Sequence, residues 1–355
     1  MHTCIYCKKE KLDSEFNREH VIPRMMGRYV NAPVLSDCQV CQDCNSYFSK
    51  EIEDKIALDS FEAFLRMKSG TKRMSDGRRL SNSRISLTGA EGIFKGLIFQ
   101  VVSDTTNSER IHFEISPCIG IKKAEDEYDY YPIDELPSAT AEMIQTLKEF
   151  ESPIIQFGYD PEEATSALIE KGYITKDAKY SVKGIEDEYG EPDFITSIKF
   201  SIDSFVRRVC AKTIFNYICW STSASNMLDS KFDALREYVR NGVWSDSLWF
   251  RYSLGFVSAV TPPNESAHAI GTMIYCNPET KMWELLGCIT WFGEITYIMK
   301  ICDLSNYEEH NVGDELKAVI CPAYDTEFMY FDNETGNISR ESALFIYGGW
   351  NSSTS

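Results

Sequence analysis

The sequence predicts an α+β protein in which a small, cysteine-rich amino-terminal module precedes a larger mixed body. Three observations lead to this prediction: five cysteines within the first 44 residues, an uneven distribution of charge, and a change from helical to strand-like hydrophobic spacing near residue 85. The chain has 355 residues. That is enough for two or three domains, because one core seldom serves many more than about 200 residues.

The first long periodic segment is helical. Apolar residues recur near helical spacing from Asn45 to Met67, and Gly70 ends the pattern. The segment Arg66–Arg84 follows as a loop or linker that either contacts phosphate or is simply solvated. It contains one acid, Asp76, and seven basic residues: Arg66, Lys68, Lys72, Arg73, Arg78, Arg79 and Arg84.

The rest of the chain mixes strands and helices. Gly92–Val102 and Arg110–Ser116 predict a hairpin, Glu125–Glu135 predicts an acidic loop, and further strands are expected at 272–276, 282–292 and 296–302. Helices are expected at about 138–150, 160–171, 203–221 and 229–241. In the helix at 203–221 the spacing directs Phe205, Val209, Ile214, Tyr217 and Ile218 inward and leaves Arg207, Arg208 and Lys212 exposed.

The charge distribution limits which surfaces are available to partners. Lys and Arg total 36 against 54 Asp and Glu, for a net charge of −18, which excludes a uniformly basic coat for nucleic acid. Residues 1–80 hold 14 basic and 12 acidic residues, for a net of +2, and the remaining 22 and 42 give a net of −20. This split favours a basic working module attached to an acidic body.

The sequence shows no targeting or membrane segment. The amino terminus lacks an apolar signal core, and runs such as Gly96–Val102 and Leu285–Phe292 are far shorter than the roughly 20 residues that span a bilayer. We therefore expect a soluble, cytoplasmic protein with no membrane partner.

Four of the early cysteines have the spacing of a metal site. Cys4 and Cys7 form one Cys-x2-Cys pair, and Cys41 and Cys44 form another after a gap of 33 residues. Two such pairs supply the four thiolates of a closed, tetrahedral Zn²⁺ site, which predicts a structural zinc. Cys38 extends the second pair to Cys-x2-Cys-x2-Cys, so that 38/41 is an alternative to 41/44.

The residues between and after these pairs resemble a known family. The run Glu19-His20-Val21-Ile22-Pro23 lies between the pairs, Asn45 directly follows Cys44, and Asp54 comes nine residues later. Over about residues 1–60 this combination is similar to the HNH nucleases of the ββα-metal fold. The resemblance implies a small zinc-stabilised ββα-metal module, which is followed by the larger mixed α+β body that the remaining sequence predicts. It also favours Cys41 and Cys44 as ligands, because the family's Asn directly follows a zinc cysteine.

The resemblance also implies residue roles. His20 is the general base that deprotonates water, and a neutral imidazole suits that task near pH 7. Glu19 and Asp54 hold catalytic Mg²⁺ or Mn²⁺, with Glu53 as the alternative to Asp54, because the family more often has His or Asn at that position. Asn45 braces the loop that carries the base through side-chain to backbone hydrogen bonds. Phosphate contacts are expected from Arg24, Arg28, Arg73, Arg78 and Arg79.

These expectations define a functional hypothesis. The chain is predicted to be a metal-dependent endonuclease acting on nucleic acid, with DNA favoured over RNA, plausible in restriction or phage defence. The alternative is a non-catalytic zinc-dependent module that binds nucleic acid or protein. The expected organisation is a nuclease module at 1–68, a basic linker at 69–84 and a targeting or regulatory body at 85–355 with a boundary near 200. A homo-oligomer or an activating ligand is compatible with it.

Overall fold

The computed structural model describes residues 1–57, 59–69, 85–90, 94–103, 111–125, 127–150, 153–176, 196–255, 267–277, 279–304, 324–333, 335 and 337–342. It confirms the predicted mixed α+β fold. The chain divides into two compact units, one formed by Met1–Arg73 with Ile202–Ser355 and the other by Met74–Ser201. This division groups the residues differently from the predicted module, linker and body, whose boundaries remain predictions.

The amino-terminal region has the ββα order that the resemblance implies. A first hairpin pairs β1 (His2–Thr3) with β2 (Glu10–Lys11), and a second pairs β3 (Glu19–His20) with β4 (Val34–Leu35). Two single-turn 3-10 helices, η1 (Asp13–Glu15) and η2 (Arg24–Met26), fill the connections. Helix α1 (Gln42–Phe48) then begins directly after Cys41.

Helix α1 continues through an irregular turn. A π-helical turn, η3 (Ser49–Glu53), follows α1 and leads into α2 (Asp54–Ile56), with Phe48, Ile52 and Ile56 buried along one side. Helix α3 (Phe61–Lys68) starts separately, because the Ser60 side chain accepts a hydrogen bond from the backbone of Ala63 and caps it. The helical segment predicted at 45–67 is therefore two helices.

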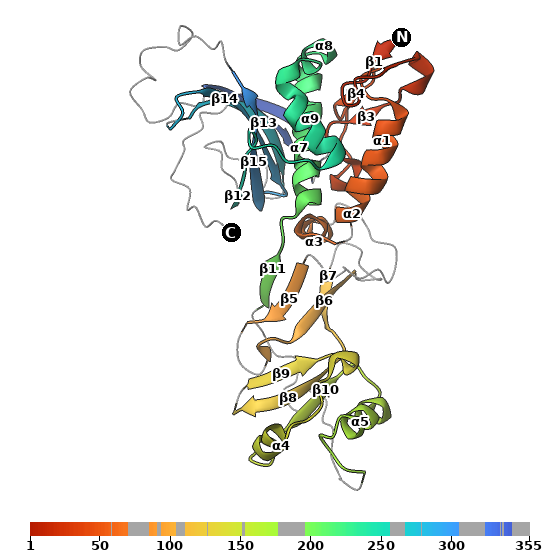
Figure 1. The fold of residues 1–355 in the computed structure, drawn as a ribbon, viewed down its shortest axis with the longest axis vertical. Coiled ribbons are helices and arrows are strands. Elements are labelled where there is room, and N and C mark those ends of the chain that lie inside the picture. The colour runs from red at the N-terminus through yellow and green to blue at the C-terminus, as the bar shows by residue number, and fades with distance from the viewer. Residues whose placement is uncertain are drawn as a thin grey trace. The chain divides into compact units, whose positions relative to one another are not determined.

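A long central helix joins this region to a sheet within the same unit. Helix α7 (Ser204–Ser221) contacts β4, η3 and α2 on one side and strands β13 and β14 on the other (Figure 1). The antiparallel sheet has the order β12-β15-β14-β13-β16-β17. Its strands are β12 (Phe250–Leu254), β13 (His268–Cys276), β14 (Trp283–Trp291), β15 (Ile295–Asp303), β16 (Tyr324–Phe331) and β17 (Ile338–Ser342). The strands predicted at 272–276, 282–292 and 296–302 are confirmed.

One glycine sets how closely α7 approaches the sheet. A Cβ atom added at Gly287 in β14 would lie 2.1 Å from Cγ2 of Ile214 in α7. Only a residue without a side chain fits under the helix at this point. The helix segment α8 (Ala224–Met227), the turn η6 (Ser230–Phe232) and α9 (Asp233–Asn241) follow α7, and Gly242 ends α9 with φ 74°.

The expected exposure of α7 is wrong at two positions. Arg207 is exposed, but Arg208 and Lys212 are buried, with exposed fractions of 7% and 1%. The helix is covered on two sides, so the polar stripe that includes both residues faces the amino-terminal region instead of solvent. A surface-helix pattern cannot reveal this, because it assumes that only one face is covered.

The second unit contains two small antiparallel sheets. One has the order β11-β5-β6-β7 and comprises β5 (Ile85–Gly89), β6 (Ile98–Ser103), β7 (Ile111–Ile115) and β11 (Thr196–Phe200). The pairing of β6 with β7 confirms the predicted hairpin. The other has the order β10-β8-β9, with β8 (Cys118–Ala124), β9 (Glu127–Tyr131), the turn η5 (Ile133–Glu135) and β10 (Ile154–Phe157).

Among the described residues of this unit, two helices pack on an apolar core. Helices α4 (Ala141–Leu147) and α5 (Pro161–Glu170) supply Leu147, Ala164 and Leu168 to a buried cluster that also contains Ile119 and Ile121 of β8. Asp160 caps α5 ahead of a proline at its first position.

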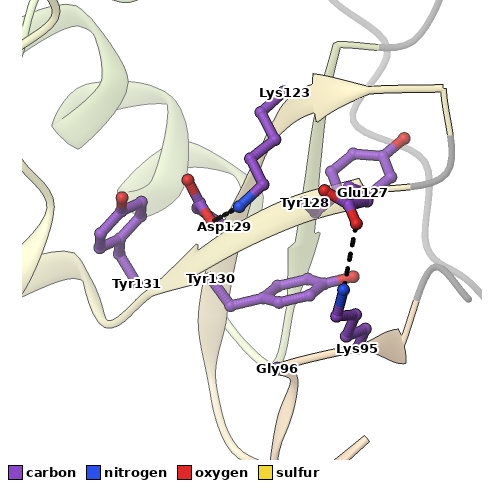
Figure 2. Close-up of a pocket in the computed structure, with 8 residues that line it drawn as sticks. All are labelled: Lys95, Gly96, Lys123, Glu127, Tyr128, Asp129, Tyr130 and Tyr131. Carbon is purple, nitrogen blue, oxygen red and sulfur yellow. Dashed lines mark hydrogen bonds and ion pairs between the residues drawn. The ribbon is translucent and has the colours of Figure 1, made fainter. Parts of the chain in front are cut away.

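The segment predicted as an acidic loop contains a strand, β9. Glu127–Tyr131 pairs with β8, and its charges are neutralised by ion pairs of Lys95 with Glu127 (3.1 Å) and of Lys123 with Asp129 (2.9 Å). These pairs border a pocket of about 420 Å³ that Tyr128, Tyr130 and Tyr131 also line (Figure 2). Alternating tyrosines favour extended structure, and this preference outweighs the acidity of the segment.

Among the described residues, no helix combines the length and apolar character that crossing a membrane requires.

Candidate active site and metal centre

Four cysteines of the amino-terminal region lie close together. The Sγ atoms of Cys4, Cys7, Cys41 and Cys44 all lie within 4.8 Å of one another, which confirms the predicted grouping. Sγ of Cys4 is 3.8 Å from Sγ of Cys44, and Sγ of Cys7 is 3.9 Å from Sγ of Cys41. A tetrahedral Zn²⁺ with Zn–S bonds of about 2.3 Å separates its sulfurs by about 3.8 Å. The donor set and its spacing therefore fit a structural zinc ion.

Neighbouring hydrogen-bond donors stabilise the cysteine sulfurs in their anionic, thiolate form. The backbone N–H of Cys41 donates to Sγ of Cys4 at 3.4 Å, and Nη1 of Arg240 in α9 lies 2.6 Å from Sγ of Cys44. Contacts of this kind orient and stabilise metal-bound thiolates. Cys38 lies outside the cluster, in a left-handed turn with φ 57°, so the geometry groups 41/44 with the first pair.

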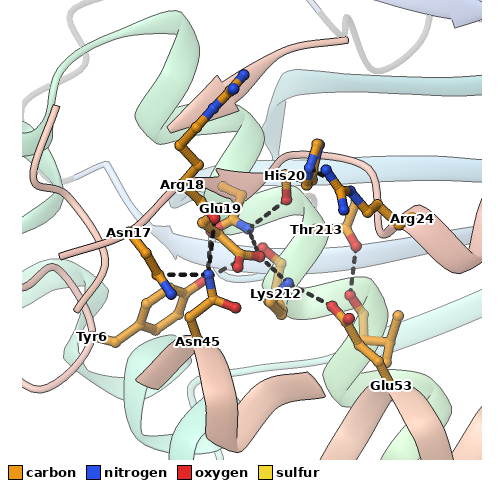
Figure 3. Close-up of polar contacts among 12 residues, drawn as sticks. Tyr6, Asn17, Arg18, Glu19, His20, Arg24, Asn45, Glu53, Lys212 and Thr213 are labelled. Atoms are coloured by element: carbon orange, nitrogen blue, oxygen red, sulfur yellow. Dashed lines mark hydrogen bonds and ion pairs between the residues drawn. The ribbon is translucent and has the colours of Figure 1, made fainter. Parts of the chain in front are cut away.

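The predicted base lies on the second hairpin, beside the predicted bracing residue. His20 is half-buried in β3, and Nδ2 of Asn45 in α1 donates to Oδ1 of Asn17 at 2.8 Å and to the carbonyl of Arg18 at 3.0 Å (Figure 3). This is the side-chain to backbone contact predicted for Asn45, and it ties the segment entering β3 to the helix. The catalytic roles of both residues remain predictions.

The imidazole of His20 is held in its neutral form. Nε of Arg24 donates to Nε2 of His20 at 2.8 Å, so Nε2 is an acceptor and carries no proton. Burial lowers the pKa of His20, and the charges of Arg24, Arg18 and Lys212 lower it further against the opposing effect of Glu53. A neutral imidazole is the form that a general base requires, but Arg24 must release Nε2 before this atom can accept a proton.

The predicted metal ligand Glu19 is bound to a lysine. Its carboxylate is buried and forms an ion pair with Nζ of Lys212 from α7, and the same Nζ lies 2.6 Å from Oε1 of Glu53 in η3 (Figure 3). Burial lowers the pKa of Lys212, but the charges and hydrogen bonds of the two carboxylates outweigh burial and raise it above its usual range. The lysine is therefore an ammonium ion placed between two acidic side chains.

A second residue of α7 completes the arrangement. Nδ2 of Asn216, one turn after Lys212, lies 3.1 Å from Oε1 of Glu19 and 3.2 Å from the carbonyl of His20. Its Oδ1 accepts a hydrogen bond of 2.7 Å from the buried hydroxyl of Tyr6. Helix α7 thus contacts both members of the predicted acid-His pair.

The residues around Glu19 do not fit a divalent cation as they stand. Oε1 of Glu19 already accepts from Lys212 and Asn216, and Asp54 is exposed on α2. Within the described ranges, the groups of three or more ligand atoms closer than 4.8 Å are the four cysteines and the set His2, Asp13 and Cys38. Neither contains Glu19, Glu53 or Asp54.

The predicted phosphate contacts separate into two groups. Arg24 and Arg28 are exposed on and just after η2, on the segment that follows His20. Arg73, Arg78 and Arg79 lie outside the described residues. Arg66, counted with the basic segment, is buried in α3 and donates to the carbonyls of Met25 and Ala57, so it is unavailable to a phosphate.

Three residues of this site were missed by the sequence analysis. Lys212, Asn216 and Arg240 are more than 150 positions away from the motif they contact, and none belongs to a recognisable motif. The available signal was Arg208, Lys212 and Asn216 at intervals of four residues within a helix otherwise rich in apolar residues. Such a polar stripe is equally typical of a solvated face.

Comparison with known proteins assigns the amino-terminal region. Residues 4–59 match a protein family described as HNH endonuclease. The resemblance found in the motif is thus confirmed for this stretch, here called the HNH domain. The match covers 56 of the 355 residues and does not extend to α7 or to the sheet. No curated protein and no solved structure matches the chain.

Proposed function

We propose that the protein is an endonuclease that hydrolyses phosphodiester bonds in nucleic acid, with DNA favoured over RNA. The observation that supports this most directly is His20, neutral and half-buried on a hairpin that Asn45 braces, inside a segment that matches the HNH endonucleases. In this proposal His20 takes a proton from the attacking water, and the exposed Arg24 and Arg28 contact the phosphate. The four cysteines hold a structural zinc that fixes the hairpin against α1.

The family implies a catalytic Mg²⁺ or Mn²⁺, which when bound would stabilise charge on the phosphate. We propose Glu19 as a ligand, and the geometry favours Glu53 over Asp54 as its partner, because Glu53 shares Lys212 with Glu19. Glu53 lies in the π turn η3, and the wider π turn changes the direction in which the side chains after it point, including that of Asp54.

The test is a nicking assay on supercoiled plasmid with Mg²⁺ or Mn²⁺. Wild-type protein should nick the plasmid, His20→Ala should not, and His2→Ala, which removes an exposed imidazole from the same region, should retain activity. Single- and double-stranded DNA and RNA of one sequence, run side by side, establish the substrate class. Nicking that survives in His20→Ala would contradict the proposed base.

A second function is favoured by two contacts. Arg24 engages Nε2 of His20, and Lys212 engages both carboxylates, so the described arrangement also suits a zinc-stabilised module that binds without cleaving. Absence of cleavage with every metal and substrate, together with retained nucleic-acid binding in a gel-shift assay, would favour this alternative. Roles of the remaining chain in targeting, regulation or phage defence are proposals that depend on the family resemblance alone.

A further inference from the structure

The ammonium of Lys212 is enclosed by the HNH domain. It contacts the carboxylates of Glu19 in β3 and Glu53 in η3 (Figure 3). It also lies 5.7 Å from the ring centroid of Phe48 in α1. The side chain is only 1% exposed. Three elements of the domain thus surround a cation that comes from a different part of the chain.

Two acidic side chains share this one ammonium, with Oε1 of Glu53 at 2.6 Å from Nζ. Burying one charged group without its counterion costs several kcal/mol, so side chains of this kind persist only where a cation neutralises them. Carboxylate oxygens from separate elements are also the ligands that Mg²⁺ and Mn²⁺ prefer. A cation is therefore required at the position that Nζ of Lys212 occupies. The ammonium and a metal ion cannot occupy this position at the same time.

We propose that Lys212 occupies the cation position of the nuclease site and competes with a divalent cation for Glu19 and Glu53. This inference rests on the proposed function. Metal binding then requires the ammonium to leave. Because Asn216 also holds Glu19, and both residues lie on α7, the site changes state when α7 shifts along or away from the HNH domain.

The surroundings of α7 connect this exchange to the rest of the unit. On its other side the helix rests on β14 at Gly287, where Ile214 makes close contact. One turn before Lys212, Nη2 of Arg208 donates to the hydroxyl of Tyr47 at 2.8 Å and also to α9 carbonyls. A movement of the sheet or of α9 would therefore move Lys212 relative to the two carboxylates.

The test measures Mn²⁺ binding to zinc-loaded, full-length protein by the electron paramagnetic resonance signal of free Mn²⁺. Lys212→Gln and Lys212→Met should bind Mn²⁺ about tenfold more tightly than wild type, because a competing unit charge is removed. Lys212→Arg keeps the charge and should show no gain. Arg207→Gln removes an exposed cation from the same helix without touching Glu19 or Glu53 and serves as the matched control.

The site of the gained affinity is checked with a second substitution. Adding Glu19→Gln or Glu53→Gln to Lys212→Gln should remove the gain. Equal Mn²⁺ affinity in wild type and in a folded Lys212→Gln protein, or a gain that persists without Glu19 and Glu53, would overturn the inference. Circular dichroism and zinc content establish folding of each variant.

A measurement on wild type covers the case in which the Lys212 variants fail to fold. Millimolar Mn²⁺ should increase amide hydrogen exchange in residues 204–221, because binding releases α7 from Glu19. Unchanged exchange in this helix at every Mn²⁺ concentration would also overturn the inference.

Plasmid nicking by the same variants separates this inference from the proposed function. A Lys212→Gln protein that binds Mn²⁺ more tightly without nicking any substrate would support competition and contradict nuclease activity. Wild type and Lys212→Gln that nick with the same Mn²⁺ dependence would support nuclease activity and contradict competition.

Discussion

Nζ of Lys212 lies 2.6 Å from Oε1 of Glu53, although 159 positions separate the two residues in the sequence. This contact and the ion pair of Lys212 with Glu19 join the HNH domain to a helix from the distant half of the chain. The predicted metal ligand is therefore part of a buried charge network as well as part of the family motif.

The first prediction concerns the strength of this network. Glu19→Gln and Lys212→Met should each lower the free energy of unfolding by about 3–5 kcal/mol, because each leaves a buried charge with fewer partners. The double variant should lose less than the sum, with a coupling of about 1–3 kcal/mol. Urea unfolding measures all three, and Glu51→Gln, which changes an exposed carboxyl two residues before Glu53, should change stability little. Strict additivity would show that the two side chains do not interact.

The second prediction concerns zinc. Cys41→Ser and Cys44→Ser should reduce zinc from one ion per chain to almost none, because each removes one of four converging ligands. Cys38→Ser should retain zinc, since Cys38 lies outside the cluster and serves as the matched control. Inductively coupled plasma mass spectrometry of freshly purified protein gives the content. If Cys38→Ser lost the metal while Cys44→Ser kept it, the assignment of 41/44 would be wrong.

The sequence predicted the HNH domain well because its chemistry is local. Cysteines separated by two residues in each pair, and an asparagine directly after the last of them, determine the site through short chain segments. The choice between Glu53 and Asp54 could not be made in this way, because a π turn changes the helix phase in between.

The contribution of α7 could not be predicted for a different reason. Hydrophobic spacing tells which residues avoid water, but not which distant element covers a polar stripe. The sequence pattern therefore predicts that Lys212 and Arg208 are solvated, whereas in the fold they contact Glu19 and Tyr47. The strands of the large sheet were predicted because their apolar runs are long and separated by turns, but their packing with residues 1–73 has no sequence signal.

The third prediction tests the packing of α7 on the sheet. Gly287→Ala should lower the free energy of unfolding by about 1–3 kcal/mol, because its methyl group would overlap Ile214. Combining it with Ile214→Ala makes room for the methyl group, so the double variant should be more stable than the sum of the single effects predicts. Thermal or urea unfolding of the four proteins tests this. A neutral Gly287→Ala would show that α7 does not press on β14.

The fourth prediction concerns pH. Nδ1 of His268 accepts from the backbone N–H of Phe292 and Nε2 donates to the carbonyl of Met26, both at 2.9 Å, and burial lowers the pKa of His268 to about 4. An unfolded histidine has a pKa near 6.5, so below that pH the unfolded state binds a proton that the folded state does not. The stability contribution is complete above about pH 6.5 and declines as the pH falls toward 4.

At pH 5.5 this loss amounts to about 1.4 kcal/mol relative to pH 7.5. Urea unfolding at the two pH values should show a larger decrease for wild type than for His268→Gln, which cannot titrate, and the difference between the two proteins isolates His268 from other groups. Identical pH dependence in both proteins would contradict the lowered pKa.

The last prediction concerns nucleic-acid binding through the basic segment. Residues 1–80, with a net charge of +2, must approach a polyanion while they are joined to residues 81–355, with a net charge of −20, so phosphate contacts have to be local. Arg73, Arg78 and Arg79 belong to the densest cationic stretch and directly follow α3. Each phosphate contact releases about one counterion, so replacing all three with Gln should flatten the slope of log K against log salt by up to about 2.7 on duplex DNA. Binding to different sequences should weaken equally, because phosphate contacts carry no base information.

Fluorescence anisotropy at several salt concentrations measures the slope. The control is a Lys8→Gln, Lys9→Gln, Lys11→Gln variant, which removes equal charge elsewhere in the first 80 residues. A triple arginine variant with the wild-type slope would show that this stretch is a solvated linker.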